Sequence, residues 1–260
     1  VVDHAGGDSW GFFSTAGDGT VFVAGVMSNS VNLTNTLTGE TVASVDMGNE
    51  QDVYVARVSV DGTPLSVWTF PTTGAEVWPL DLEYADGALL LGGYVGGTIT
   101  FGGVTLTSGN NGTVSSGFVV KLSATDGTVQ WARLVEGKTA VGSATVYRPT
   151  LNQNGNVGVS GNRCEGVWTD CAAYVSLLDG DTGDVMWDKD LGMQTERAAA
   201  LGYGDGKFYV GSGFVGTLVV DDLEVTALSN FDGLVLVLDA ADGTALWAAA
   251  VTGDTIQGWR

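Results

Sequence analysis

The feature that most constrains the fold of this chain is an internal repeat of about 60 residues. Its clearest marker is a turn glycine followed four residues later by tryptophan. The copies with this spacing are Gly127 with Trp131, Gly183 with Trp187, and Gly243 with Trp247. A fourth copy, Gly62 with Trp68, carries two extra residues. Periods of this length are typical of propellers and solenoids, in which each repeat is one supersecondary unit.

A second marker lies earlier in each repeat, where a hairpin turn precedes a short apolar run that ends in glycine. Its copies run from Asp18-Gly19 to Gly25, from Asp86-Gly87 to Gly93, from Asn154-Gly155 to Gly161, and from Asp205-Gly206 to Gly211. Asp-Gly and Asn-Gly favour type I′ turns, whose two central residues both have positive φ. The two markers together predict four units, approximately 8–74, 75–137, 138–193 and 194–253.

The second unit shows how one repeat divides into strands. Leu80–Tyr84 alternates as a half-buried strand does, and Ala88–Leu91 is apolar throughout, which is typical of a strand covered on both faces. Thr98–Thr107 reads as a small hairpin, and Phe118–Leu122 is expected to pair with Val129–Val135. We therefore predict an all-β, β-propeller-type repeat domain spanning residues 1–260, with about four blades of four antiparallel strands.

Both ends of the chain are expected to be cut inside a repeat. Val1–Gly7 aligns with the outer strand that closes a preceding unit, and Thr255–Arg260 aligns with the opening of a following unit. The chain is therefore expected to be a fragment of a longer array. Glu196–Leu201 has helical propensity, but it occupies the place of a unit's first strand, so the repeat register favours a strand there.

The recurring tryptophans have two readings. A ring at the start of an outer strand can fill the wedge between blades, where it would bury about 150–250 Å², or it can form a platform on which a sugar stacks. Recurrence at one register favours packing, because a single binding site does not need the same residue in every unit. We therefore predict that Trp131, Trp187 and Trp247 are buried at equivalent positions, with Trp68 a looser fourth member.

The charge of the chain excludes some partners. Thirty acidic and ten basic residues give a formal net charge of −20, which repels nucleic acid and anionic membrane surfaces. No apolar stretch approaches the roughly 20 residues that span a bilayer, so no membrane insertion is expected. The charge favours a role in solubility in a salty medium over the alternative, a surface that gathers cations.

The two cysteines, Cys164 and Cys171, are expected to form a disulfide across a hairpin tip. Two thiols alone make a poor zinc site, and the single histidine, His4, is distant in sequence. A disulfide indicates an oxidising compartment. Asn32 and Asn111 begin Asn-x-Thr sequons in Thr/Ser/Asn-rich stretches that are expected to be exposed loops. We therefore predict a protein that is secreted or on the cell surface, and a glycoprotein with glycan on Asn32, Asn111 or both if the source is a eukaryote.

One loop is a candidate metal site. Asp179, Asp181 and Asp184 lie in a glycine-containing loop, where their oxygens could bind Ca²⁺. The loop lacks the downstream bidentate acid of an EF-hand, and it coincides with a turn that other units build without three acids. A solvated turn is therefore favoured.

The sequence contains candidates for two kinds of catalytic site. Ser–His–Asp or Cys–His catalysis would depend on His4, which lies at a terminus, so catalysis of these types is not expected. Glu76, Asp81 and Glu83 could line a funnel as the paired carboxylates of a glycoside hydrolase. The alternation of polar positions along ordinary strands is favoured over this reading.

Two resemblances to known repeats cover nearly the whole chain. Leu122–Trp131 and Leu238–Trp247 resemble the tryptophan-docking motif of quinoprotein-like β-propellers. Gly97–Ser108, followed by Gly117–Leu122, is similar to the SBBP-type β-propeller repeats of bacterial secreted surface proteins. Quinoprotein dehydrogenases bind pyrroloquinoline quinone, usually with Ca²⁺, at the central axis and often beside a vicinal disulfide. This chain has no adjacent cysteines, so none of their catalytic residues is carried over and no cofactor is expected.

These patterns lead to one functional prediction and one alternative. We predict a non-enzymatic extracellular structural or interaction module, such as a surface, matrix, adhesin or filament component. Its expected partners are other proteins or glycans, and further copies of the repeat. The alternative is part of a quinoprotein-type or glycan-active β-propeller enzyme. A funnel with clustered acids or a cofactor would favour the enzyme, because propellers host many unrelated activities.

Overall fold

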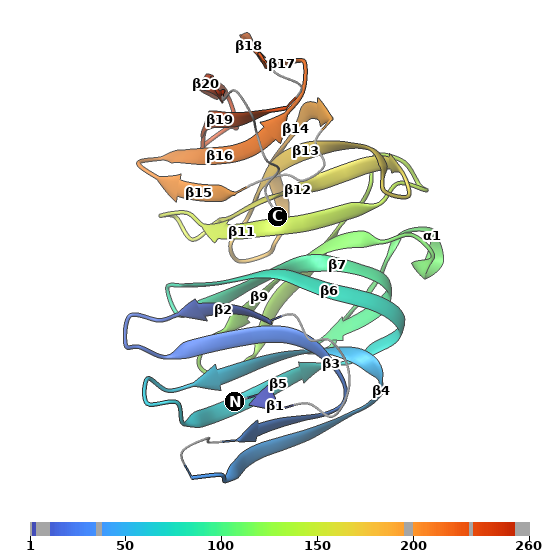
Figure 1. Cartoon of the computed structure of the whole chain (residues 1–260), viewed down its shortest axis with the longest axis vertical. Helices are drawn as coiled ribbons and strands as arrows, with labels where there is room; N and C mark the ends of the chain where they lie inside the picture. Colours follow the sequence, from blue (N-terminus) through green and yellow to red (C-terminus); the bar gives the residue numbers. More distant parts are fainter. Residues whose placement is uncertain (1, 4–10, 35–37, 195–199, 229–230, 253–260) are drawn as a thin grey trace. The chain divides into compact units, whose positions relative to one another are not determined.

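A computed structural model describes residues 2–3, 11–34, 38–194, 200–228 and 231–252 (Figure 1). The chain separates into two compact units, Val1–Val135 and Glu136–Arg260. Glu196–Ala199, most of Val1–Gly7 and all of Thr255–Arg260 lie outside the described residues.

The first sheet contains five strands, all antiparallel to their neighbours. They are β1 (Val2–Asp3), β2 (Gly11–Thr15), β3 (Val21–Thr34), β4 (Thr41–Val58) and β5 (Pro64–Phe70). Strands β2, β3, β4 and β5 lie in chain order, and β1 pairs with the far end of β3, where Val2 lies opposite Leu33. The first described residues therefore pair within the first sheet. For Val2 and Asp3, the prediction of an outer strand that closes a preceding unit is therefore wrong.

The second sheet completes the first unit. It contains β6 (Thr72–Ala85), β7 (Ala88–Phe101), β8 (Val104–Thr107), β9 (Ser116–Ser123) and β10 (Val129–Val135), with the short α1 (Gly109–Gly112) between β8 and β9. The order is β6-β7-β9-β10, and β8 pairs with the end of β7. The hairpin predicted within Thr98–Thr107 is confirmed, as is the pairing of Phe118–Leu122 with Val129–Val135.

The second unit contains two further four-stranded sheets and one separate hairpin (Figure 1). The third sheet is β11 (Ala144–Leu151), β12 (Val157–Gly166), β13 (Thr169–Leu178) and β14 (Val185–Gln194). The fourth is β15 (Leu201–Gly204), β16 (Lys207–Phe214), β19 (Asp232–Asp239) and β20 (Ala245–Val251). The hairpin of β17 (Thr217–Val220) and β18 (Leu223–Thr226) lies between β16 and β19 in the chain. Each of the four predicted repeats thus contains one antiparallel sheet with four main strands, and the first two sheets carry one additional short strand each, which confirms the β-propeller-type fold class.

Each unit has its own apolar core between its two sheets. In the first unit, alternate residues of β3 and β4, such as Phe22 and Val55, join residues of β7 and β9, such as Leu89 and Val120. In the second unit, residues of β13 join residues of β16 and β19 in the same way. The alternation follows from the strand, whose successive side chains point to opposite faces. The core is therefore the surface along which one repeat packs against the next.

The inner hairpin turns are of two kinds. Asp86 and Gly87 both have positive φ, 50° and 76°, as do Asp205 and Gly206, so the type I′ prediction is correct there. At Asp18-Gly19 and Asn154-Gly155 only the glycine has positive φ. These turns have three-residue loops, in which a type I turn is followed by one left-handed residue. The type I′ prediction is wrong at those two places.

Candidate functional site

The first feature that links sheets is the docking of a tryptophan on a turn of the next sheet. In the second unit, Trp187 on β14 lies against the turn between β19 and β20. Its indole Nε1 donates a hydrogen bond to the carbonyl oxygen of Ala240 at 3.1 Å. Its ring makes an edge contact with Phe208 of the fourth sheet, with the centroids 5.9 Å apart. One indole therefore joins the outer strand of the third sheet to the fourth sheet.

Glycine at the turn makes this approach possible. Gly243 has φ +75°, and a Cβ added there would lie 2.8 Å from Cε3 of Trp187. Real Cβ atoms do not approach other atoms this closely, and an L-residue with a side chain rarely adopts this φ. Gly243 therefore serves both as the left-handed residue of the turn and as the floor on which the indole rests.

The same arrangement recurs in the first unit. A Cβ added at Gly127, which has φ +73°, would lie 2.3 Å from Cδ2 of Trp68. Beside this contact, the guanidinium of Arg57 donates to the carbonyl oxygen of Thr125 at 3.4 Å. We call this pairing of an outer-strand tryptophan with the glycine of the next outer turn the tryptophan joint. The described residues include one such joint inside each unit.

The strand register shows where the two extra residues in the first copy of the motif place its tryptophan. Trp187 lies opposite Leu177, two residues before Asp179, whose amide and carbonyl groups close the turn. Trp68 lies opposite Val55, four residues before the corresponding Ser59. Trp68 is thus displaced along the strand by an even number of residues, so it keeps the same face of the sheet.

An ion pair lies beside the joint of the second unit. Lys189 on β14 donates to the carboxylate of Asp221, with Nζ 2.6 Å from Oδ2, and the same oxygen accepts from the amide of Ala245 at 2.8 Å. The hydrogen bond from Lys189 and then that from Ala245 hold the pKa of Asp221 below its usual value. Both groups are partly exposed, so this pair orients the strands more than it stabilises them.

The other two tryptophans have different surroundings. Trp131 is 4% exposed and is therefore buried, but Trp247 is 48% exposed. The prediction that Trp247 is buried is therefore wrong. Trp68 and Trp187 rest on the outer turn of the sheet that follows in the chain, and among the described residues no later turn exists beyond β20, which carries Trp247.

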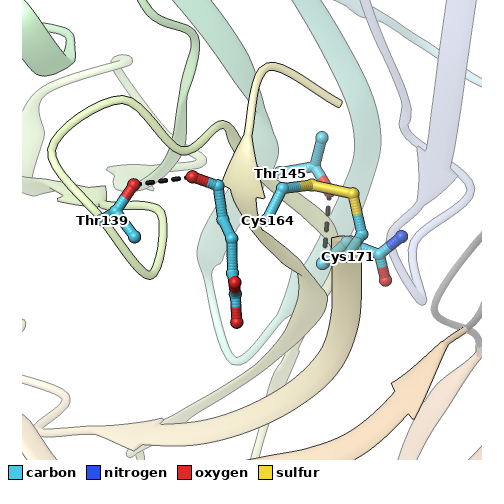
Figure 2. Close-up of a disulfide and its surroundings, with 6 residues drawn as sticks. Thr139, Thr145, Cys164 and Cys171 are labelled. Atoms are coloured by element: carbon cyan, nitrogen blue, oxygen red, sulfur yellow. Dashed lines mark hydrogen bonds between the residues drawn. A yellow bond between two sulfur atoms is a disulfide. The ribbon is translucent and has the colours of Figure 1, made fainter. Parts of the chain in front are cut away.

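The predicted disulfide is present. Cys164 on β12 and Cys171 on β13 lie directly opposite each other near the hairpin tip and are bonded (Figure 2). The loop before β11 is fastened to this hairpin, because the hydroxyl of Thr139 donates to the carbonyl oxygen of Glu165 at 2.6 Å. A Cβ at Gly142 would lie 2.0 Å from the carbonyl oxygen of Cys164. The disulfide thus stabilises a hairpin that also positions a loop.

A polar cluster crosses the third sheet. Arg163 on β12 reaches the carboxylate of Asp188 on β14 with both terminal nitrogens, one of them at 2.8 Å. The hydroxyl of Ser176 donates to the same carboxylate. The guanidinium carbon of Arg163 also lies 4.1 Å from the ring centroid of Tyr174, a cation–π geometry.

The protonation states of this cluster follow from its contacts. Burial raises the pKa of Asp188, but the hydrogen bonds from Arg163 and Ser176 outweigh burial and hold the pKa below its usual value. Burial raises the pKa of the Tyr174 hydroxyl, which donates to the carbonyl oxygen of Thr145 at 3.0 Å. At neutral pH the carboxylate is charged and the phenol is protonated. The cluster thus holds its charges in place and presents no activated nucleophile.

In the candidate metal loop, a carboxylate oxygen of Asp179 is used in hydrogen bonds within the turn. The Oδ1 atom of Asp179 accepts hydrogen bonds from the amides of Asp181 and Thr182, at 3.0 and 2.9 Å. Asp184 donates its amide to the hydroxyl of Thr182. Across the described part of the chain, no group of three His, Cys, Asp or Glu side chains is placed to hold a metal ion. The structure therefore does not bring Asp179, Asp181 and Asp184 together as a Ca²⁺ site.

The candidate carboxylates are spread along β6. Asp81 and Glu83 are both partly buried, and Glu76 is exposed, where it accepts a hydrogen bond from the indole of Trp78 at 3.1 Å. His4 lies outside the described residues.

The two sequons differ in their surroundings. Asn111 is exposed, with φ 56°, in a turn where Asn110 and Asn111 are both left-handed, so α1 is not a regular helix. Asn32 is partly buried and belongs to strand β3, so the expectation that it lies in an exposed loop is wrong. Glycosylation of either asparagine stays a prediction.

Two sets of contacts in this structure do not follow from the sequence patterns. The patterns mark Gly127 and Gly243 as turn residues, but the structure shows in addition that a tryptophan ring packs on each of them. Their constant place in the repeat is the signal that could have found them. Arg163 and Asp188 are 25 residues apart, and only strand register brings them together, so no sequence signal marks that pair.

No family model and no curated protein matches the chain. Among solved structures, it is similar to quinohemoprotein alcohol dehydrogenase from Comamonas testosteroni, with 13% identity and a TM-score of 0.45 over 95% of this chain and 45% of that one. A europium-containing methanol dehydrogenase has 11% identity and a TM-score of 0.41 over 92% of this chain and 52% of that one. A cobalt-substituted apocarotenoid oxygenase from Synechocystis has 10% identity and a TM-score of 0.44 over 93% and 61%.

Two predictions are corrected by these comparisons. The prediction of a non-enzymatic structural or interaction module is contradicted, because the solved structures that resemble the chain are enzymes. The prediction of no cofactor is contradicted because their names include a quinohemoprotein, europium and cobalt. At these identities the likeness is one of fold alone.

The chain spans about half the length of the dehydrogenases. Among the described residues, no helix is long and apolar enough to cross a membrane. In fold, this chain is similar to the quinoprotein dehydrogenase β-propellers.

Proposed function

We propose that the chain is part of an enzyme-type β-propeller of quinoprotein-like construction, in which its four sheets form blades that support the catalytic site. The observation that carries the proposal is the tryptophan joint, seen at Trp68 with Gly127 and at Trp187 with Gly243. The sequence motif that forms this joint is the one that resembles the tryptophan-docking motif of quinoprotein-like propellers. The tryptophan of the joint lies on the same face of the outer strand in both units, although Trp68 is displaced along its strand by two residues, and this recurrence is expected of blades in one array.

The described residues do not fit a quinone site of the kind that this resemblance implies. The disulfide joins cysteines seven residues apart, not adjacent ones. Within the described ranges, no cluster of three candidate ligands is available for the accompanying metal ion. We therefore derive no catalytic step through a quinone and assign no described residue a catalytic role. The proposal places the reacting groups in other parts of the complete protein.

A location outside the cytoplasm accompanies this proposal. The Cys164–Cys171 disulfide supports it, because structural disulfides persist in oxidising compartments. The similarity of Gly97–Ser108 to repeats of secreted surface proteins supports the same location.

The test compares the complete native protein with the isolated 260-residue chain. Metal analysis, absorption spectroscopy and dye-linked oxidation of primary alcohols are measured on both. We expect the complete protein to carry a bound cofactor and to turn over, and the isolated chain to fold without activity. A complete protein with no bound group and no turnover of alcohols would refute the proposal. So would a fully active isolated chain.

A further inference from the structure

The segment that connects the two units is fastened to the disulfide-bonded hairpin of the third sheet. It runs from the end of β10 to the start of β11, and we call its residues 138–143 the strap. The amide of Lys138 donates to the carbonyl oxygen of Cys164 at 3.0 Å, and the amide of Cys164 donates to the carbonyl oxygen of Ser143 at 2.8 Å. The amide of Ser143 in turn donates to the carbonyl oxygen of Gly166 at 3.1 Å. Both backbone groups of Cys164 are therefore bonded to the strap.

Two side chains of the strap add to this contact. The hydroxyl of Thr139 donates to the carbonyl oxygen of Glu165 at 2.6 Å, so a second residue of the hairpin tip holds the strap (Figure 2). The Nζ atom of Lys138 lies 2.8 Å from Oδ2 of Asp190, but both side chains are partly exposed, so this ion pair contributes little. The strap is thus held mainly by hydrogen bonds to the residues that follow the first cysteine of the hairpin.

The disulfide fixes these hairpin residues. Cys164 lies opposite Cys171, and because its N–H and C=O both bond to the strap, the two cysteines are a non-hydrogen-bonded pair of the ladder. The disulfide is therefore the link between β12 and β13 at this position. Beyond it, Trp168 and Asp170 at the tip have left-handed φ, 57° and 52°. Non-glycine residues keep this conformation only where the surrounding structure imposes it, so breaking the disulfide lets the tip relax.

The two cysteines differ in their accessibility to a reductant. Cys164 is 0% exposed, whereas Cys171 is partly exposed, so a thiolate from outside reaches the Sγ atom of Cys171. Its attack forms a mixed disulfide with Cys171, breaks the S–S bond of the protein and leaves the electron pair on Cys164, which takes up a proton. If the reductant is a dithiol, its second thiol attacks the mixed disulfide and releases Cys171 as a thiol. The dithiol is oxidised to a disulfide, and the protein disulfide is reduced to two thiols.

We propose that the Cys164–Cys171 disulfide is a redox-controlled clamp on the segment that connects the two units, and that a dithiol is the class of reductant that opens it. In the oxidised chain the strap is bonded to the hairpin. Reduction frees the hairpin residues that bond to the strap, so the strap is released. Release of residues 138–143 adds up to about 20 Å of extended chain to the connection. The clamp does not require the proposed enzymatic role.

Limited digestion with a lysine-specific endoprotease reports on the strap, because the protease cleaves only where the chain opens locally. Lys138 lies in the strap, whereas Lys121, Lys189 and Lys207 lie in strands β9, β14 and β16. The oxidised 260-residue chain is expected to resist cleavage after Lys138. After reduction with dithiothreitol, cleavage there is expected to be at least about tenfold faster, because the hairpin has lost its cross-link. Cleavage at the three lysines in strands is expected to stay unchanged.

Three outcomes of this digestion overturn the proposal. The first is a reduced chain that still resists cleavage after Lys138. The second is a rise of cleavage to the same extent at all four lysines, because the disulfide then holds the whole fold and not the strap. The third is a disulfide that dithiothreitol does not reduce in the folded chain, as measured by mass spectrometry after alkylation of free thiols.

Variants separate the clamp from other effects of the reductant. Replacement of Cys164 and Cys171 together by serine is expected to give the cleavage pattern of the reduced chain, with no further change on addition of dithiothreitol. A double variant that resists cleavage in the strap as the oxidised chain does would overturn the clamp.

A change in the strap itself keeps the disulfide intact. Thr139→Ala removes the hydrogen bond to Glu165, so cleavage after Lys138 in the oxidised chain is expected to be about two- to tenfold faster. Thr182→Ala is the matched control, because Thr182 is also an exposed threonine of the second unit whose hydroxyl donates a hydrogen bond, here to Asp179 at 3.1 Å. This control is expected to be cleaved like the unmodified chain. Equal acceleration by the two variants, or none by Thr139→Ala, would overturn the role of the strap contacts.

Discussion

The tryptophan joint makes a quantitative prediction for Gly127→Ala. The new methyl group would lie 2.3 Å from Cδ2 and 2.4 Å from Cγ of Trp68, so the indole must move. Overpacking of this kind costs about 1–3 kcal/mol. The residue must also keep φ +73°, which costs a non-glycine residue roughly 1–2 kcal/mol. The free energy of unfolding of the first unit is therefore expected to fall by about 2–5 kcal/mol.

Urea unfolding measures this loss, and two further variants separate its causes. Gly87→Ala, in the same unit, has φ +76° and no described atom within 4 Å of the added Cβ, so it is expected to lose only the backbone part. When Trp68 is already replaced by Ala, the loss of unfolding free energy caused by Gly127→Ala should be as small as that caused by Gly87→Ala, because no ring remains for the new methyl group to clash with. The reasoning is refuted if Gly127→Ala destabilises no more than Gly87→Ala, or if its effect is unchanged without the Trp68 ring.

Three further predictions concern the second unit. Trp187→Phe should lower the free energy of unfolding by about 1–3 kcal/mol in urea titrations, because the hydrogen bond to Ala240 is lost and the ring is smaller; an unchanged midpoint would contradict the joint. Replacing Cys164 and Cys171 together by serine should lower it by about 2.5 kcal/mol, the entropy of closing so short a loop, and reducing agent should shift the melting temperature of the unmodified chain but not of the variant. The pKa of Asp188 is lower in the folded than in the unfolded chain, so the stability that its charged form contributes is present above about pH 4 and is lost as the pH falls through the folded pKa. Thermal melts of Asp188→Asn should lack this part of the loss of stability in acid. A variant with the same dependence of melting temperature on pH as the unmodified chain would contradict this prediction.

The strands and the disulfide could be predicted from the sequence because their signals are local and repeated. Alternating or continuous apolar runs between turn residues mark β6, β7, β9 and β10, and four copies in one register exclude chance matches. The cysteines lie on either side of the tip of one hairpin, so local geometry alone brings them together. The repeat period also predicted that each repeat of about 60 residues would form one four-stranded sheet.

The contacts between strands and between sheets were decided only by the tertiary structure. The pairing of Arg163 with Asp188 depends on the registers of β12, β13 and β14, and a shift of one residue would place the two side chains on opposite faces. The burial of a tryptophan depends on whether another turn lies over it. Trp187 and Trp247 carry the same local motif, yet Gly243 covers the first and the second is exposed, because a local motif specifies the strand and the turn but not the neighbouring sheet.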